Sequence, residues 1–242
     1  MSLPVFVHSE LGAAAVGSVV SRAGDEGRHA AVVRRIRPDE QIEVVDGAGI
    51  RLRCQVEDVT KTSLTARVLE VRHESRPGPR ITVVQAIPKG ERAELAVEVL
   101  TEIGVDVIVP WAAARSVGVW RGERAAKSLA KWRSAAREAA KQSRRAWFPE
   151  VAEMATTAEV AALLHSADLG LVLHEDASTP ITPIADAQSV VLVVGPEGGI
   201  APEELEAFGD ARSVRLGPTV LRTSTAGVAA VAALLSGSPR WA

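Results

Sequence analysis

A glycine-rich turn directly follows a continuously apolar stretch late in the chain. Val190–Val194 is typical of a buried strand, and Pro202 opens a helix shortly after it. In an open α/β sheet, ligands bind beyond the carboxyl ends of the strands. Glycines at such a place let the backbone approach a ligand and expose its N–H donors. We therefore predict a ligand site, against the alternative of a tight turn that binds nothing. The turn consists of Gly195, Pro196, Glu197, Gly198 and Gly199.

A second strand-to-helix turn lies nearer the C-terminus. Arg212–Leu216 is expected to be a short strand, and an Ala/Val/Leu-rich helix is predicted over Leu221–Leu235. Two turns at neighbouring strand ends would form one pocket. Arg222 would lie near the helix N-terminus, where the helix dipole disfavours a cation. That placement suggests function, with an ordinary surface arginine as the equal alternative. The second turn contributes Leu216, Gly217 and Leu221 to the candidate pocket.

Positive charge is concentrated in one block of a chain whose net charge is only −2. Residues 111–148 carry ten basic and two acidic side chains, and a long helix is predicted over Glu123–Trp147. An apolar stripe on that helix is expected to face the core, which leaves a basic stripe to face outward and suits phosphate contact. A solvated face with no partner is the alternative. The candidate phosphate contacts are Arg133, Arg137, Lys141, Arg144 and Arg145, with Arg34 and Arg35 further upstream.

The elements that position these residues fall into two domains. Residues 41–72 alternate apolar and polar side chains between turns and predict a β meander, preceded by a short helix over Gly27–Arg37 that ends at Pro38. The Pro-Gly-Pro segment of residues 73–80 marks a boundary, so we expect a small β-barrel-like domain over 1–73. Apolar strands that alternate with helices predict a parallel α/β sheet over 74–242. The other elements expected there are Ile81–Ile87, Glu91–Ile103, Val105–Val109 and Leu169–Leu173.

Several classes of protein are disfavoured by what the sequence lacks. The five histidines have no partner at ligand spacing, so no metal site is expected. No nucleophile elbow is present, and the single Cys54 cannot form an intrachain disulfide. No stretch is long and apolar enough for a transmembrane helix, and the N-terminus does not resemble a signal peptide. We therefore expect a cytoplasmic protein without a membrane partner.

These segments, in this order, resemble the ribosomal RNA small subunit methyltransferase E family of the SPOUT superfamily. The resemblance extends over nearly the whole chain, and the Gly-Pro-Glu-Gly-Gly turn together with Leu-Arg-Thr-x-Thr-Ala is its most specific part. The matching stretches are 88–90, 100–110, Arg115-Ser116, 142–145, 194–200 and 216–226, with His29, Val33-Arg34 and 44–47 in the N-terminal half.

The resemblance implies a PUA-like barrel followed by an α/β domain with a deep trefoil knot. It implies S-adenosylmethionine bound in the knot, a homodimer, and methylation of N3 of one uridine in the 16S rRNA of the small ribosomal subunit. We predict that backbone groups of Gly195–Gly199 and Leu216–Leu221 form the cofactor cradle. Arg222 would orient the base or stabilise its developing charge, and Glu197 is a weaker candidate for the proton acceptor.

The chain departs from the family pattern at two positions. Ser224 stands where the family usually has Glu, so a carboxylate there cannot be the base in this chain. Ala201 stands where the family usually has a hydroxyl residue, so the helix at Pro202 lacks a side-chain N-cap, a loss of about 1 kcal/mol. Two other functions stay open: a non-catalytic RNA-binding or ribosome-assembly module, and ribose 2′-O-methylation by a SPOUT enzyme.

Overall fold

The chain divides into two compact units, and each unit consists of two separate segments of the sequence. The computed structural model describes residues 3–8, 10–90, 92–118, 120–184 and 186–241. The first unit comprises Met1–Arg76 and Ala140–Phe148, and the second comprises Pro77–Ala139 and Pro149–Ala242. The predicted boundary after residue 73 assigns Ala140–Phe148 to the second domain. In the structure this segment packs on the first unit, where Ala48 forms a β-bridge with Trp147.

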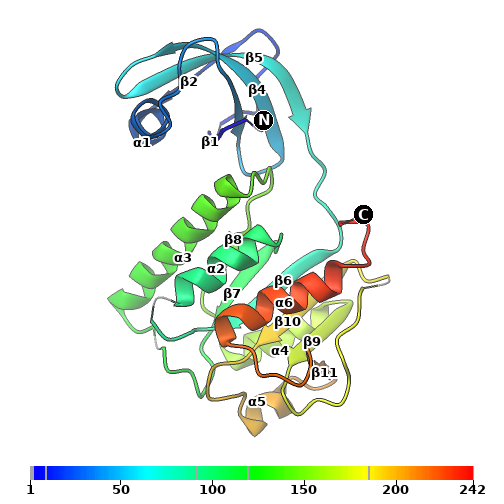
Figure 1. Cartoon of the computed structure of the whole chain (residues 1–242). Coiled ribbons are helices and arrows are strands. Elements are labelled where there is room, and N and C mark those ends of the chain that lie inside the picture. The colour runs from blue at the N-terminus through cyan, green and yellow to red at the C-terminus, as the bar shows by residue number, and fades with distance from the viewer. Residues whose placement is uncertain (1–2, 9, 91, 119, 185, 242) are drawn as a thin grey trace. The chain divides into compact units, whose positions relative to one another are not determined.

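A five-stranded mixed sheet that curls around its own core makes up most of the first unit (Figure 1). Its strand order is β1-β3-β4-β5-β2, in which only the pair β1–β3 is parallel. The inward side chains, among them Phe6, Leu52 and Leu64, are almost fully buried. This arrangement agrees with the expected PUA-like half-barrel. The strands are β1 (Val5–Val7), β2 (Val19–Ala23), β3 (Gln41–Val45), β4 (Ile50–Val59) and β5 (Ser63–His73).

The helix predicted over Gly27–Arg37 is shorter in the structure and divided. It consists of α1 (Gly24–Arg28) and a wider helical turn, η1 (His29–Val33). The backbone leaves the helical conformation because Arg35 adopts a left-handed φ of 53°, four residues before Asp39 does the same with a φ of 69°. The helical segment therefore ends at the left-handed residue Arg35, before Pro38 is reached.

The second unit is built on a six-stranded sheet in which every neighbouring pair is parallel, as predicted. Its order is β11-β9-β10-β6-β7-β8, so β6 lies between β10 and β7 near the centre. Parallel strands need crossover connections, and these place helices on both faces of the sheet. The strands are β6 (Arg80–Ala86), β7 (Val107–Trp111), β8 (Glu150–Val151), β9 (Leu169–Leu173), β10 (Ser189–Val194) and β11 (Arg212–Val214).

Each face of this sheet buries a separate apolar core. Along β6, Ile81 and Val83 belong to one core, and Val84 and Ala86 belong to the other, as the alternation of side chains on a strand requires. Figure 1 shows α2, α3 and α6 over the first face and α4 with α5 over the second. The helices are α2 (Arg92–Glu102), α3 (Glu123–Gln142), α4 (Thr157–Ser166), α5 (Pro202–Ala207) and α6 (Thr223–Leu235).

Among the element ends that differ from the sequence-based expectation, three have an identifiable local cause. Strand β7 continues through Pro110 to Trp111 because its outer neighbour β8 is only two residues long, so few ladder bonds depend on the missing N–H. Helix α3 ends at Gln142 instead of Trp147, since Arg144 takes a left-handed φ of 57°. Helix α6 begins two residues later than predicted, at Thr223, with Arg222 as its N-cap.

Helix α4 was not expected from the sequence, and its local cause is a capping box. The hydroxyl of Thr156 accepts from the Glu159 N–H, and the Glu159 carboxylate accepts from the Thr156 N–H at 2.7 Å. These hydrogen bonds from the Thr156 backbone and hydroxyl hold the pKa of Glu159 below its usual range.

A buried ion pair joins the C-terminal residues to the edge of the sheet core. The Arg240 guanidinium lies 2.8 Å from the Asp106 carboxylate and also donates to the carbonyls of Pro79 and Gly104. Asp106 in turn accepts from the backbone N–H of Ile81 at 2.8 Å. One carboxylate therefore ties the start of β6 to the chain near residue 240.

None of the described helices combines the length and apolar character that crossing a bilayer requires.

Candidate functional site

Both predicted turns lie at the carboxyl edge of the parallel sheet. The turn Gly195–Gly199 follows β10, and the loop Leu216–Leu221 follows β11. In the sheet these two strands are separated by β9. Because parallel strands end at one edge, the two segments flank the end of β9 on either side.

The glycine turn is shaped by one left-handed residue and one close approach. Gly199 has a φ of 73°, a conformation that side chains other than glycine rarely adopt, and its N–H donates to the Pro196 carbonyl at 2.9 Å. Gly198 is needed for a different reason. A Cβ at Gly198 would lie 3.0 Å from the carbonyl oxygen and 3.1 Å from the Cβ of Arg115. The loop after β7 therefore packs directly on this turn.

The loop after β11 presents an unusual amount of unpaired backbone. In the described part of the chain, the N–H groups of Leu216, Gly217, Val220 and Leu221 make no hydrogen bond, and the loop is exposed from Gly217 onward. Val220 is 79% exposed although it is apolar. Leu216 and Gly217 also line a cavity of about 230 Å³. Free donors beside a cavity and an uncovered apolar side chain fit a loop that contacts a bound molecule.

Arg222 lies at the start of α6, as predicted. Its carbonyl accepts from Thr225 and Ala226, while its guanidinium is exposed and makes no hydrogen bond or ion pair with the described residues. Ser224, the position where the resemblance leads one to expect Glu, is buried in the first turn of α6. The cation that can reach a ligand at this helix end is therefore Arg222.

Glu197 contacts the loop after β6. One of its carboxylate oxygens accepts from the Lys89 N–H at 3.3 Å, and the other makes no hydrogen bond among the described residues. Glu197 thus helps to hold the turn while one oxygen stays available. Sequence reasoning assigned no role to Lys89 or to Arg115, although both lie beside the turn. Their only signal was that they fall in stretches that carry the family resemblance.

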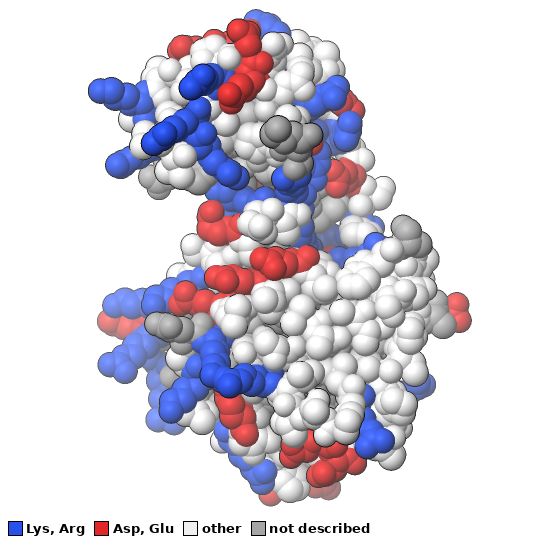
Figure 2. All heavy atoms as spheres, viewed as in Figure 1, with Lys and Arg blue, Asp and Glu red and all other residues white. Residues whose placement is uncertain are grey.

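The residues of the basic stripe differ in their surroundings. The Arg133 guanidinium donates to the Val151 carbonyl at 3.1 Å and pairs with Glu153 at 3.0 Å. Arg137 is exposed and forms no ion pair in the described part of the chain. Arg144 is also exposed, while Lys141 and Arg145 are half-buried. In the second unit, Lys and Arg side chains gather where α3 begins (Figure 2). Exposed cations of this first half of α3 that sequence reasoning did not single out are Arg124, Lys127 and Lys131.

The predicted contacts of the first unit, Arg34 and Arg35, are both exposed. They lie just after η1, where the left-handed φ of Arg35 turns the chain. The apolar stripe of α3 is buried as predicted, with Leu129, Trp132 and Ala136 in the core of the second unit.

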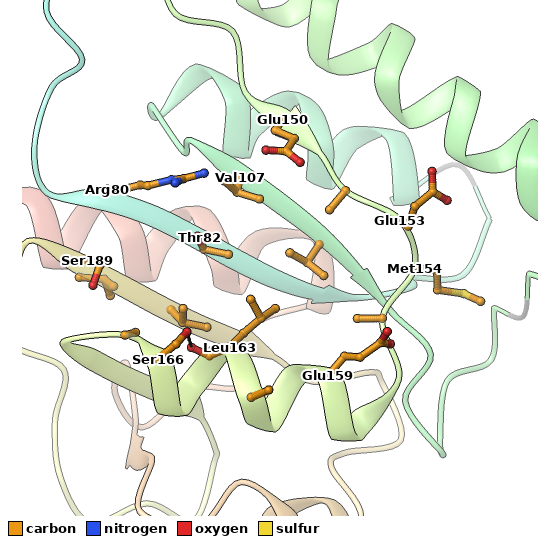
Figure 3. Close-up of a pocket in the computed structure, with 17 residues that line it drawn as sticks. Arg80, Thr82, Val107, Glu150, Glu153, Met154, Glu159, Leu163, Ser166 and Ser189 are labelled. Carbon is orange, nitrogen blue, oxygen red and sulfur yellow. Dashed lines mark hydrogen bonds between the residues drawn. The ribbon is translucent and has the colours of Figure 1, made fainter.

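A larger cavity lies away from the glycine turn. It has a volume of about 700 Å³ and lies over the first residues of β6, β7 and β10, between α4 and the segment that follows β8. Figure 3 shows Glu153 and Met154 on one side of it and Glu159, Leu163 and Ser166 on the other. None of the sequence-predicted site residues lines this cavity.

The remaining reactive groups do not gather into a second centre. Among the residues that the structure describes, no three His, Cys, Asp or Glu side chains are placed to share a metal ion. Burial raises the pKa of the Cys54 thiol to about 12, so this thiol is not a nucleophile at neutral pH.

Two family models match the two parts of the chain. A model described as an RNA methyltransferase domain matches residues 75–235, and a model described as an RNA methyltransferase PUA domain matches residues 23–69. The matched ranges correspond to the parallel α/β sheet with its helices and to the greater part of the curled sheet.

Similar proteins extend over almost the full length. The chain is 50% identical over 233 residues to the ribosomal RNA small subunit methyltransferase E of Mycobacterium bovis, covering 93% of this chain and 89% of that protein. It is 29% identical to the protein of the same name from Bacillus subtilis, with 88% of each covered. The crystal structure of a ribosomal RNA small subunit methyltransferase E from Neisseria gonorrhoeae bound to S-adenosyl methionine is 29% identical, with a TM-score of 0.87 and 97% and 98% of the two chains covered.

Proposed function

Because this chain belongs to the ribosomal RNA small subunit methyltransferase E family, we propose that it transfers a methyl group from S-adenosylmethionine to N3 of a uridine in 16S rRNA. The observation that carries the proposal is the position of the Gly195–Gly199 turn and the Leu216–Leu221 loop on either side of β9 at the carboxyl edge of the sheet. A ribosomal substrate places this work in the cytoplasm. The deep trefoil knot expected from the resemblance stays a prediction.

The residues present fit the cofactor. The unpaired N–H groups of Leu216, Gly217, Val220 and Leu221 are donors that a nucleoside and its amino-acid tail can use, and the exposed Val220 side chain offers apolar contact. Gly195–Gly199 supplies the facing backbone, with Gly198 and Gly199 free of side chains. When bound, S-adenosylmethionine supplies an electrophilic methyl group on a sulfonium sulfur.

The chain's own part in the reaction is alignment and charge stabilisation. Sulfur, methyl carbon and the acceptor nitrogen must lie in line, which rigid strand ends can enforce. Uracil N3 loses its proton, and negative charge spreads over O2 and O4. The unpaired guanidinium of Arg222 stabilises that charge, and the free oxygen of Glu197 accepts the proton. A stacked base cannot reach these groups, so the uridine must be turned out of its stack.

Methyl transfer itself tests the proposal against both alternatives. Small subunits from a strain that lacks the modification are incubated with labelled S-adenosylmethionine and the protein, and the digested nucleosides are identified by mass spectrometry. We expect label in a uridine methylated on N3. Label on a ribose would assign the protein to the 2′-O-methyltransferases. Absence of any transfer, together with calorimetry that detects no cofactor binding, would favour a non-catalytic RNA-binding module.

Gly198→Val is expected to weaken cofactor binding because its side chain would press on Arg115 and displace the turn. Overpacking of this kind typically costs about 1–3 kcal/mol, which corresponds to roughly 5- to 150-fold in affinity. Calorimetric titration with S-adenosylmethionine measures the change. Gly12→Ala is the control, since a Cβ at Gly12 meets nothing within 4 Å. Unchanged affinity in a folded Gly198→Val protein would remove this turn from the cofactor site.

Arg222→Ala is expected to lower turnover by roughly 100-fold and to leave cofactor affinity within about twofold, because Arg222 acts on charge that develops in the transition state. Single-turnover kinetics and cofactor titration separate the two effects. Arg212→Ala removes another exposed arginine from β11 and should leave both values unchanged. Equal losses in turnover and cofactor affinity would make Arg222 a cofactor-binding residue instead.

RNA binding by the basic helix predicts a graded salt dependence. Arg137→Gln should reduce the slope of log K against log salt by about 0.7–0.9, the contribution of one phosphate contact. Arg133→Gln should change the slope less, because the Arg133 guanidinium already pairs with Glu153. RNA titrations at several salt concentrations measure both slopes. If Arg137→Gln keeps the wild-type slope, Arg34 and Arg35 become the leading phosphate contacts.

We also propose that the protein acts as a homodimer through α6. This helix has no charged residue over Thr223–Leu235, although its outer face is partly exposed through Val228, Ala229, Ala232 and Ala233. Figure 2 shows few charged side chains on the surface over α6. An exposed apolar helix face of this kind favours a symmetric contact between identical chains.

Sedimentation equilibrium tests the dimer directly. We expect twice the chain mass of 25.5 kDa at micromolar concentration, and a mass near that of one chain for Ala229→Glu, because a charge would be buried at the contact. Ala130→Glu places the same charge on an exposed face of α3 and should leave the dimer intact. A wild-type protein that sediments as a single chain would contradict the proposal.

A further inference from the structure

Arg115 is an exposed cation that lies against the glycine turn. It lies in the loop after β7, and its Nη1 approaches the Gly198 carbonyl oxygen at 3.4 Å. Its side chain is exposed and forms no ion pair in the described part of the chain. A guanidinium has five donors in a planar fork that suits the oxyanion of a phosphate. Only one of those donors is directed at the turn, so the rest are available to a ligand.

The loop that carries Arg115 is held by a buried carboxylate from another element. Glu204 of α5 is 5% exposed, and its Oε1 accepts from the Ala114 N–H at 2.8 Å and from the Thr157 hydroxyl at 3.2 Å. Its Oε2 accepts from the Ala201 N–H at 3.0 Å. A buried carboxylate needs such donors to offset its desolvation. Through them Glu204 joins the residue before Arg115 to the end of the glycine turn.

The position of this loop in the sheet indicates which ligand Arg115 faces. In the sheet, β6 and then β7 lie on one side of β10, whereas β9 and then β11 lie on its other side. The Leu216–Leu221 loop and Arg115 therefore flank the glycine turn from opposite sides. A cofactor held between the turn and the Leu216–Leu221 loop leaves Arg115 on the side where the second substrate must approach. Lys89, exposed after β6, adds a further cation there.

We propose that Arg115 is a substrate-binding residue that contacts an RNA phosphate beside the target uridine, and that Glu204 is the positioning residue that holds Arg115 against Gly198. This inference rests on the proposed methyl transfer to RNA. It assigns the loop after β7 to the RNA side of the site and gives the buried Glu204 a role beyond helix capping.

The first arm of the test replaces Arg115. Arg115→Ala should lower kcat/KM for small subunits roughly 10- to 100-fold, as loss of a charged hydrogen bond predicts, and reduce the salt slope of RNA binding by about 0.7–0.9. Arg115→Lys should keep the slope, because it keeps the charge, and recover part of kcat/KM. Affinity for S-adenosylmethionine should stay within about twofold. A matching loss of cofactor affinity would assign Arg115 to the cofactor carboxylate, and unchanged RNA binding would overturn the proposal.

The second arm tests whether Glu204 acts through Arg115. Glu204→Gln replaces one acceptor oxygen by an NH2 donor, so either the Ala114 N–H or the Ala201 N–H loses its acceptor. Glu203→Gln makes the same change at an exposed neighbour and should be silent. In the Glu204→Gln background, Arg115→Ala should change RNA affinity less than about twofold further. Additive losses would show that Glu204 does not position Arg115. Thr157→Val, which removes one donor to Glu204 together with the acceptor of the Trp111 indole N–H, gives the same comparison.

Direct RNA titration keeps this inference separate from the proposed function. A wild-type protein that binds RNA but transfers no methyl group would contradict the proposed function. The effect of Arg115→Ala on the salt slope of RNA binding would still test the inference. If the wild-type protein methylates normally, and Arg115→Ala changes neither the salt slope of RNA binding nor kcat/KM, only the inference would be contradicted.

Discussion

The parallel arrangement of the six-stranded sheet is the constraint on which the rest of the second unit depends. Parallel neighbours cannot be joined by tight hairpins, so each connection crosses a face of the sheet and returns the chain to the same edge. The loops that leave β6, β7, β10 and β11 therefore begin at one edge. Lys89, Arg115, Gly198 and Arg222 come together near that edge because of topology, although they are spread widely along the chain.

Buried polar groups determine how these loops lie once topology has brought them together. In the part of the chain that the structure describes, Glu204 pairs with no cation, and its two oxygens accept from N–H and hydroxyl donors of three segments. Asp106 lies at the opposite edge of the sheet, where the strands begin, and accepts from the Ile81 N–H and the Arg240 guanidinium. In both cases a desolvated carboxylate makes a displaced loop costly, because any donor that moves leaves charge uncompensated. Packing alone would not specify the loops so closely.

The sequence predicted those parts whose cause is local. Strands β9 and β10 were found because strands buried on both faces are continuously apolar, and the glycine turn was found because its residue types permit close backbone approach. Strands β1 and β2 were missed because they are short and pair with distant segments. The end of α3 was missed because a non-glycine residue, Arg144, takes the left-handed conformation. The hydrogen bond from the Ala114 N–H to Glu204 joins α5 to the loop after β7. The periodicity of the sequence contains no signal for such a contact between distant segments.

The interrupted make-up of the two units has a consequence for how the protein can be dissected. The segment Ala140–Phe148 belongs to the curled sheet, where its Trp147 donates to the Glu74 carbonyl and stacks against Arg76. A fragment that stops at residue 76 would expose the surface which this segment covers, and a fragment that starts at 77 would carry the segment without its partner. Exchange of the first unit with that of a relative therefore requires two pieces, residues 1–76 and 140–148, instead of one. Synthesis has a similar effect, since the first unit is complete only after the whole of α3 and the residues up to Phe148 have left the ribosome.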